Sequence, residues 1–381
     1  MTVPRPRTTF GDGHVDQLLT EVLAAVGSDT NDDLIRSLLV TALDMDSADV
    51  DRLELKIAAQ SVVEMLNSWQ VFAAEQATPK VTIFGSARTK PGAADYELAR
   101  DFGAAMSRRG WMAITGAGPG IMTAGIEGAG VDRSFGVSIV LPFEARAAEI
   151  IDGDPKLAAF KYFFTRKLTF MKESDAFALF PGGFGTLDEA FELLTLIQTG
   201  KSYPAPVVLL DHPGSTYWSG WLDFVRAELL GGGMINEDDL GIFLHTNDAE
   251  EAAAHLAGFY SCYHSIRYVG QRLVLRLRSR PTADAIATLN DEFADIVVSG
   301  QIEEADATSA ERRDDDHVEL PRLALRFDNR SFGRLVQLIW RVNELGQDHT
   351  PEVGLDLVHD VGPDPHADAE PPPNEPPPNE P

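Results

Sequence analysis

The sequence predicts an α/β protein built on a doubly wound parallel sheet, with N-terminal helices and a small C-terminal α+β domain. Two observations lead to this prediction. Short apolar runs alternate with helix-compatible stretches from residue 81 onward, the pattern of a parallel sheet covered by helices on both faces. Three of these runs end in glycine-bearing loops, at the carboxyl ends of strands where such sheets bind ligands.

The first 76 residues are expected to lie outside the sheet. Residues 1–13 are typical of a flexible start. In the helical segment predicted at 14–76, apolar residues recur every three or four positions: Val62, Met65, Leu66, Trp69 and Phe72. This spacing places them on one face of a helix, so the segment is expected to wrap the main domain.

The main domain is predicted over residues 77–262. Strands are expected at 81–85, 111–115, 136–141, 176–180 and 206–211, with a weaker one at 241–245. Helices are expected between most of them, at 95–109, 156–173, 187–199 and 217–230. The three glycine loops, which follow the strands at 81, 111 and 176, are expected to converge on one pocket.

A small β-α-β-α domain is predicted over residues 263–346. Its elements are expected at 272–278, 282–298, 321–327 and 331–344, with an acidic loop at 301–317. Residues 347–381 repeat Pro-Pro-Pro-Asn-Glu. Such a composition cannot bury a core, so this tail is expected to be disordered.

Composition narrows the class of protein. Of the 381 residues, 44% are hydrophobic, which is ample for a packed core, and the net charge is −27. So acidic a chain does not favour nonspecific binding to nucleic acid or anionic membranes. The single cysteine, Cys262, excludes an internal disulfide and fits a reducing compartment. Without a signal peptide or an apolar run of membrane-spanning length, we expect a soluble cytoplasmic protein.

The most informative stretch is 176–189, an apolar strand followed by Pro-Gly-Gly-Phe-Gly-Thr and a helix that opens with two carboxylates. Glycine amides and the free amides of a helix's first turn make an anion site. Thr186 and Glu189 also have the spacing of a capping box. On these residues alone, Glu189 is best explained as a cap on the Thr186 amide, and Asp188 as a first-turn acid favoured by the helix dipole.

The loop Gly116-Ala-Gly118-Pro-Gly120 is a poor dinucleotide fingerprint. Ile121 replaces the third glycine, and no acidic residue follows where a ribose partner is expected. This argues against NAD and leaves two interpretations, mononucleotide contact or a tight turn without a ligand. No Walker A loop is present.

A basic, aromatic stretch occupies residues 156–172 of this acidic chain. Its cations are Lys156, Lys161, Arg166, Lys167 and Lys172. Two interpretations remain open. The stretch could be an amphipathic helix with solvated cations, or Arg166 or Lys167 could face the anion held by the 181–186 turn, since arginine suits bidentate phosphate recognition.

The sequence offers no metal site. The nine histidines show no metal-ligand spacing, and Cys262-Tyr-His264 lacks the companion ligands that zinc needs. His245, at a predicted strand end, is better explained as a hydrogen-bonded structural residue than as a base. The sequence also lacks G-x-S-x-G and H-E-x-x-H.

Taken together, these motifs resemble the LONELY GUY (LOG) family over roughly residues 80–245. The resemblance lies in Phe84-Gly-Ser-Ala-Arg88, Thr115-Gly-Ala-Gly-Pro-Gly-Ile-Met122, Leu141-Pro-Phe-Glu144, Tyr162-Phe-Phe-Thr-Arg-Lys167, Pro181-Gly-Gly-Phe-Gly-Thr-Leu-Asp-Glu189 and Leu194-Thr-Leu-Ile-Gln-Thr-Gly-Lys201. The segments before and after lie outside it, as in the longer bacterial members. Two departures concern base or ribose contacts: Ala117 replaces a usual glycine, and the residues after Glu144 lack an Asn-Pro pair.

The resemblance implies a Rossmann-like fold, homodimers or larger homo-oligomers, and hydrolysis of the N-glycosidic bond of nucleoside 5′-monophosphates, AMP-like or cytokinin ribosides. It implies that Arg166 and Glu189 are the catalytic pair. It implies the following substrate-binding residues: Ser86, Gly118, Gly120, Met122, Lys167, Gly182, Gly183, Gly185 and Thr186. In the mechanism that fits these residues, Glu189 stabilises positive charge on the sugar and activates water, and no metal or redox cofactor is required.

The alternative is a non-catalytic nucleotide sensor in which the pocket binds a ligand and residues 263–346 relay the signal. Intact Arg166 and Glu189 argue against it, because a sensor has no need of that pair. Lysine decarboxylation is the weakest option, since no pattern suggests a lysine placed to hold pyridoxal phosphate.

Overall fold

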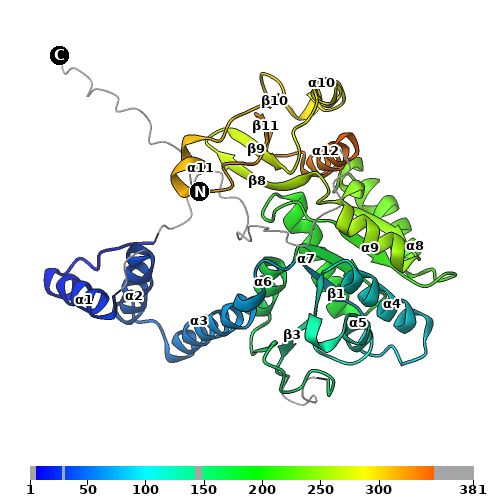
Figure 1. Ribbon diagram of the computed structural model, residues 1–381. Coiled ribbons are helices and arrows are strands. Elements are labelled where there is room, and N and C mark those ends of the chain that lie inside the picture. Colours follow the sequence, from blue (N-terminus) through cyan, green and yellow to red (C-terminus); the bar gives the residue numbers. More distant parts are fainter. Residues whose placement is uncertain (1–5, 28–30, 142–147, 347–381) are drawn as a thin grey trace. The chain divides into compact units, whose positions relative to one another are not determined.

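The computed structural model describes residues 6–27, 31–141 and 148–346 (Figure 1). Three predicted segments therefore lie wholly or partly outside the described residues: the first five residues, positions 142–144 of the Leu-Pro-Phe-Glu motif, and the tail. The chain divides into two compact units, Met1–Leu66 and Asn67–Pro381. Each is described here by itself.

The first unit is helical, as predicted. It contains α1 (Gly13–Val26), α2 (Asp32–Ser47) and the first part of α3 (Arg52–Phe72). Asp12 caps α1 by accepting hydrogen bonds from two backbone amides of its first turn, and such a cap stabilises a helix by about 1 kcal/mol. Arg36 of α2 donates to the backbone oxygen of Asp16 in α1 at 2.9 Å. Leu19, Leu23 and Val40 are the large buried side chains of this helix pair.

The second unit is built on a seven-stranded parallel sheet with the order β4-β3-β2-β1-β5-β6-β7. Its strands are β1 (Lys80–Phe84), β2 (Met112–Thr115), β3 (Ser134–Ile139), β4 (Leu157–Phe160), β5 (Ala176–Leu179), β6 (Val207–Leu210) and β7 (Phe243–Thr246). The chain builds outward from β1 to β4 and then returns to place β5 on the other side of β1. This reversal between β1 and β5 is the switch point of a doubly wound, Rossmann-like sheet, which confirms the predicted fold class.

Helices cover both faces of this sheet (Figure 1). One face carries α4 (Ala94–Arg108), α5 (Ile121–Ala129) and α9 (Ala249–Gly258), with α4 packed on the other two. Because connections run in opposite directions on the two sides of the switch point, right-handed crossovers place α6 (Phe163–Glu173), α7 (Phe184–Gln198) and α8 (Tyr217–Phe224) on the opposite face. Phe72, at the end of α3, stacks on Phe135 of β3, with 4.3 Å between ring centroids.

The prediction of one helix over 156–173 is wrong. Residues Leu157–Phe160 form β4, and α6 begins only at Phe163. This strand has four residues at the sheet edge. It contains two alanines and is flanked by a lysine on each side, and both residue types are good helix formers. Pairing with β3 overrides that local preference.

A second, antiparallel sheet has the order β10-β11-β9-β8. Its strands are β8 (Tyr263–Val269), β9 (Arg272–Leu277), β10 (Glu303–Glu304) and β11 (Arg322–Leu325), accompanied by α10 (Ala283–Glu292), α11 (Ser309–Asp314) and α12 (Phe332–Leu345). The predicted β-α-β-α order is incomplete, because it lacks β8, β10 and α11. The hairpin between β8 and β9 turns at Gly270, whose φ of +59° suits glycine.

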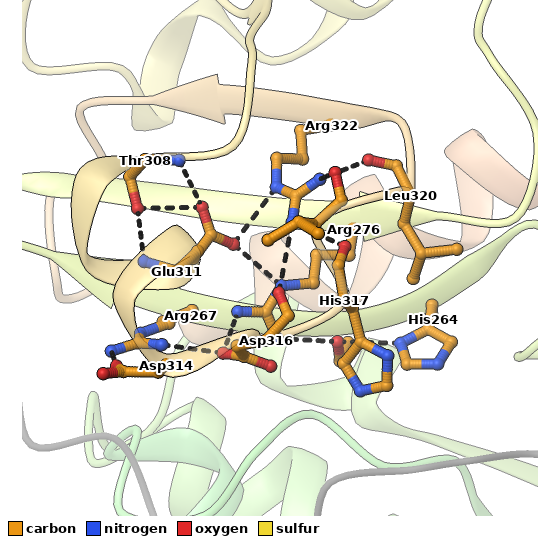
Figure 2. Close-up of polar contacts among 12 residues, drawn as sticks. His264, Arg267, Arg276, Thr308, Glu311, Asp314, Asp316, His317, Leu320 and Arg322 are labelled. Atoms are coloured by element: carbon orange, nitrogen blue, oxygen red, sulfur yellow. Dashed lines mark hydrogen bonds and ion pairs between the residues drawn. The ribbon is translucent and has the colours of Figure 1, made fainter.

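The predicted acidic loop at 301–317 contains α11, which is fastened to this sheet by buried ion pairs (Figure 2). Arg276 and Arg322 both contact the same oxygen of Glu311, at 2.9 and 3.1 Å. The other Glu311 oxygen accepts the Thr308 amide at 2.8 Å, in a capping box. Asp316 accepts from Arg267 at 2.7 Å. The carboxylates of this segment therefore neutralise two buried arginines, Arg276 and Arg322, and the partly buried Arg267 of the strands.

Helix α12 joins the antiparallel sheet to the main sheet. The Asn343 side-chain oxygen accepts hydrogen bonds from the amides of Cys262 and Tyr263, at 2.9 and 2.8 Å. The Trp340 ring stacks on His255 of α9 at 4.2 Å between centroids. We keep the division at residue 262 as a proposal about domains. None of the helices in the described residues combines the length and apolar character that a bilayer crossing requires.

Candidate active site

Three loops meet at the switch point, as the sequence predicted. The Ser86 amide, after β1, donates to the Pro181 carbonyl, after β5, at 3.1 Å. The Ile121 amide, at the start of α5, donates to the Ser86 carbonyl at 3.1 Å. The loops at the ends of β1, β2 and β5 are therefore tied together by their backbones.

Two glycines make this convergence possible. Gly120 has a φ of +72°, and a β-carbon there would lie 2.3 Å from the Ser86 carbonyl oxygen. A β-carbon at Gly85 would lie 2.5 Å from the Ile121 side chain. Neither position accepts a larger residue without separating the loops.

The Pro-Gly-Gly turn leaves open space beside its backbone. A β-carbon on Gly183 or Gly185 would meet no atom within 4 Å. Gly183 is the N-cap of α7, and no side chain caps that helix. The first-turn amides of α7 can therefore bind an anion. The Tyr217 hydroxyl of α8 donates to the Gly182 carbonyl at 2.7 Å and so connects the turn to α8.

The capping-box explanation of Glu189 is wrong. Because the helix begins at Phe184, Thr186 and Glu189 lie inside α7 rather than at its N-cap and third position. Both are buried; the Thr186 hydroxyl oxygen lies against Gly182, where a β-carbon would be only 2.1 Å away. The glycine N-cap starts the helix three residues earlier than the Thr-x-x-Glu pattern suggests.

Glu189 is a buried acid with an unused oxygen. Its residue is 5% exposed, and its Oε2 has no hydrogen-bond partner among the described residues. Burial raises the pKa of Glu189 to about 7, against the opposing charges of Lys167 and Arg166. A carboxyl group with a pKa close to neutrality suits general acid–base chemistry.

Arg166 is a partly buried cation that interacts electrostatically with Glu189. Its Nε donates to the Val137 carbonyl at 2.9 Å, and its guanidinium lies 5.1 Å from the centre of the Phe170 ring. A β-carbon on Gly116 would lie 2.5 Å from an Arg166 nitrogen, so this glycine admits the guanidinium beside the second loop. Burial lowers the pKa of Arg166 and Glu189 opposes that effect, and arginine remains charged.

Lys167 connects α6 to α7 through ion pairs. Its ammonium is 2.9 Å from Asp188 and also pairs with Glu192. The interpretation of Lys156 and Lys172 as solvated cations of one amphipathic helix is wrong. Lys156, before β4, pairs with Asp154, and Lys172, on α6, pairs with Glu173, at 2.8 and 2.7 Å.

The remaining predicted residues lie on the second and first loops. The Met122 side chain packs against Gly116 and Gly118, where β-carbons would meet it at 2.8 and 2.6 Å. The Ser86 hydroxyl accepts the Arg88 amide at 3.1 Å. Among the described residues, no group of three or more His, Cys, Asp or Glu is placed to hold a metal ion.

Sequence reasoning missed one contributor. Tyr217 orients the turn, and the signal that could have found it is its place directly after the loop that follows β6. Ala117, noted in the sequence as a departure from glycine, has a φ of +55°, the left-handed conformation that explains why glycine is usual there. His245 was interpreted correctly as structural, since its Nε2 lies 2.9 Å from Asp211.

Comparisons with known proteins place sequence similarity over the main sheet and its helices. A family model described as "Possible lysine decarboxylase" matches residues 119–256. The cytokinin riboside 5′-monophosphate phosphoribohydrolase of Mycobacterium tuberculosis is 34% identical over 137 residues, which are 35% of this chain and 69% of that protein. The phosphoribohydrolase LOG4 of Arabidopsis thaliana is 33% identical over 101 residues, 26% of this chain and 45% of the plant protein.

Among solved structures, the molybdenum cofactor carrier protein of Chlamydomonas reinhardtii is similar with a TM-score of 0.33 and 18% identity, over 46% of this chain and 94% of that one.

Proposed function

Because this chain belongs to the LOG family of cytokinin riboside 5′-monophosphate phosphoribohydrolases, we propose that it hydrolyses the N-glycosidic bond of nucleoside 5′-monophosphates. The products are the free base and ribose 5-phosphate. AMP-like nucleotides and cytokinin riboside 5′-monophosphates are the substrate classes.

One observation carries this proposal. Glu189 is buried with an unused carboxylate oxygen, and it lies in the first turns of the helix whose uncapped N-terminus follows the glycine turn. An unpaired buried carboxylate costs stability. A group of this kind persists where function needs it.

The reaction follows from the charge that builds on the sugar. As the bond from C1′ to the base nitrogen breaks, its electron pair goes to the base and the ribose ring becomes positive. Ionised Glu189 stabilises that charge and accepts a proton from the water whose oxygen bonds to C1′. The leaving base takes up a proton, so the overall change is hydrolysis. Arg166 supports the ionised state of Glu189 or assists the leaving base.

The phosphate supplies binding energy away from the bond that breaks. Amides of the turn, from Gly182, Gly183, Gly185 and Thr186, are proposed to hold it. Ser86, Gly118, Gly120 and Met122 are proposed to border the nucleoside. Since remote binding energy accelerates the reaction, nucleosides without phosphate are expected to be poor substrates. The reaction needs no metal or redox cofactor.

We propose that the protein works as a homodimer or a larger homo-oligomer in the cytoplasm, without a nucleic-acid or membrane partner. Three phenylalanines at the starts of α6 and α7 support self-association, since Phe184, Phe164 and Phe163 are 93%, 55% and 50% exposed. Aromatic side chains are enriched in protein interfaces. Light scattering of the purified protein tests the assembly; a monomer at micromolar concentration contradicts it.

The function is tested by release of free base from a panel of nucleoside 5′-monophosphates and the matching nucleosides. We expect turnover of at least one monophosphate and little of its nucleoside. Glu189→Gln and Arg166→Ala are expected to lose about 10²-fold or more, whereas Glu228→Gln, at an exposed acid outside the site, keeps wild-type rates. A wild-type protein that releases no base from any monophosphate refutes the proposal.

A further inference from the structure

We infer that Lys167 is a positioning residue, which locks α6 against α7 and sets the pH range in which Glu189 is ionised, rather than a substrate contact. This inference deepens the proposed function and rests on it. It assigns to Lys167 a role different from that of Arg166, its neighbour on α6.

The geometry separates the two neighbours. Consecutive helical residues project about 100° apart. The Arg166 side chain points toward β3 and the second loop, where it contacts the Val137 carbonyl and lies beside Gly116. Lys167 instead reaches α7, where its ammonium contacts Asp188 at 2.9 Å and also Glu192.

Its two partners flank the proposed catalytic acid. Asp188 precedes Glu189, and Glu192 lies one helical turn after it, a spacing at which side chains are neighbours. The Lys167 side chain is 15% exposed, whereas those of Asp188 and Glu192 are 56% and 33% exposed. The lysine is therefore the least exposed member of this cluster, and its ammonium pairs with both carboxylates.

The charges around Glu189 come mainly from these two helices. Helix α6 supplies Arg166 and Lys167, and α7 supplies the two flanking acids. The loops 116–120 and 181–186 contain no ionisable side chain. Further ionisable groups on the adjoining segments are Arg88 and Lys90 after β1, Lys161 and Tyr162 before α6, and Tyr217 on α8.

Removing Lys167 would leave two acids beside Glu189 and one cation. Burial already raises the pKa of Glu189 to about 7, Lys167 is the strongest opposing influence, and Asp188 and Glu192 raise it further. Like charges disfavour ionisation. Without the lysine, most Glu189 would be protonated at neutral pH and unable to accept a proton from water.

The test compares Lys167→Met with Lys167→Arg in the full-length protein. The readout is kcat/KM for a nucleotide that the wild type cleaves, between pH 5 and 9. On its acidic side the profile has a limb, along which kcat/KM falls as Glu189 becomes protonated. We expect the midpoint of this limb to move up by about 1 pH unit in Lys167→Met and to stay in place in Lys167→Arg. In Asp188→Asn/Glu192→Gln the limb is expected to move down.

Lys172→Met is the matched control, because Lys172 lies on the same helix and pairs with Glu173 rather than with α7. Its limb is expected to stay at the wild-type pH. A Lys167→Met profile that is lower but unmoved makes the lysine merely structural and overturns the inference. A raised KM with an unmoved limb would identify Lys167 as a substrate contact, which also overturns the inference.

A second readout needs no turnover. The gain in unfolding free energy from Glu189→Gln, measured by urea unfolding against pH, reports the ionisation of Glu189. In the Lys167→Met background this gain is expected to reach its plateau at a higher pH than in the wild-type background. The same pH in both backgrounds refutes the inference, and an inactive wild type refutes only the proposed hydrolysis.

Discussion

At the scale of single residues, the site places a carboxylate where the folded protein does not favour its charge. Glu189 is 5% exposed, and one of its oxygens is unpaired within the described chain. Arg166 and Lys167 compensate this burial in part. The local geometry thus costs stability, as is common at active sites, where function and stability are traded against each other.

This trade-off makes Glu189→Gln a stabilising substitution at alkaline pH. The pKa of Glu189 is raised from 4.5 to about 7, so the folded state binds the proton more tightly than the unfolded state. Its contribution to stability is complete below pH 4.5 and is lost as pH rises through 7. The free energy of unfolding of Glu189→Gln should therefore exceed that of the wild type by on the order of 3 kcal/mol at pH 8 and by almost nothing at pH 4.

Urea unfolding of both proteins across this pH range measures the gain. The pKa of about 7 already includes the attraction of Lys167 and Arg166 for the carboxylate, so this figure is the net cost of the charge in the folded state. A glutamine variant that is less stable than the wild type at pH 8 would show that Glu189 is held by contacts that keep it ionised.

At the scale of elements, the glycine turn and the start of α7 form the proposed phosphate site. Gly183→Ala and Gly185→Ala add a methyl group in open space, so neither should lower the melting temperature. Each methyl would occupy room beside the proposed phosphate and should raise KM for the nucleotide about tenfold or more, a loss of about 1.4 kcal/mol in binding. Gly258→Ala, equally open on α9, is the matched control. An unchanged KM in both turn variants would place the phosphate elsewhere.

Helix α11 depends on its buried carboxylate. Despite the opposing effect of burial, hydrogen bonds from Thr308 and Arg276 hold the pKa of Glu311 below its ordinary value. Glu311→Gln leaves two buried arginines short of a charge partner and should cost about 3 kcal/mol of unfolding free energy.

The control for this prediction is Glu303→Gln, which breaks an exposed pair with Arg272 and should cost less than about 1 kcal/mol. Urea unfolding compares the two, and hydrogen exchange should show faster exchange over 308–320 only in Glu311→Gln. Equal costs would mean that the buried network contributes no more than a surface pair.

Most elements of the main sheet could be predicted from the sequence, because buried parallel strands are continuous apolar runs between glycine loops. Strand β4 could not, since its four residues favour a helix locally and become a strand only by pairing with β3. The helix start at Phe184 was missed for a related reason: Thr186 and Glu189 fit a capping box, and only the glycine turn decides where α7 begins. The loop convergence was predictable from topology, whereas the contact of Lys167 with α7 depends on how two helices pack.

At the scale of the whole molecule, a net charge of −27 surrounds a site proposed to bind an anion. The protein's overall field repels a nucleotide, whereas the amides of the glycine turn and Arg166 are proposed to attract it. Salt screens such long-range repulsion. We therefore expect kcat/KM for a monophosphate to rise between about 10 and 150 mM salt, and the weak reaction of its nucleoside to stay constant. A steady fall with salt would mean that local positive charge dominates the approach.

The account's central claim is that an ionised Glu189 acts on the sugar of a bound nucleoside 5′-monophosphate. Single-turnover release of adenine from AMP, measured with excess protein at pH 8, tests it most directly, with AMP binding measured in parallel by calorimetry. We predict one equivalent of adenine from the wild type, and from Glu189→Gln similar AMP affinity with release at least 10²-fold slower. Release at the wild-type rate by Glu189→Gln would contradict the claim.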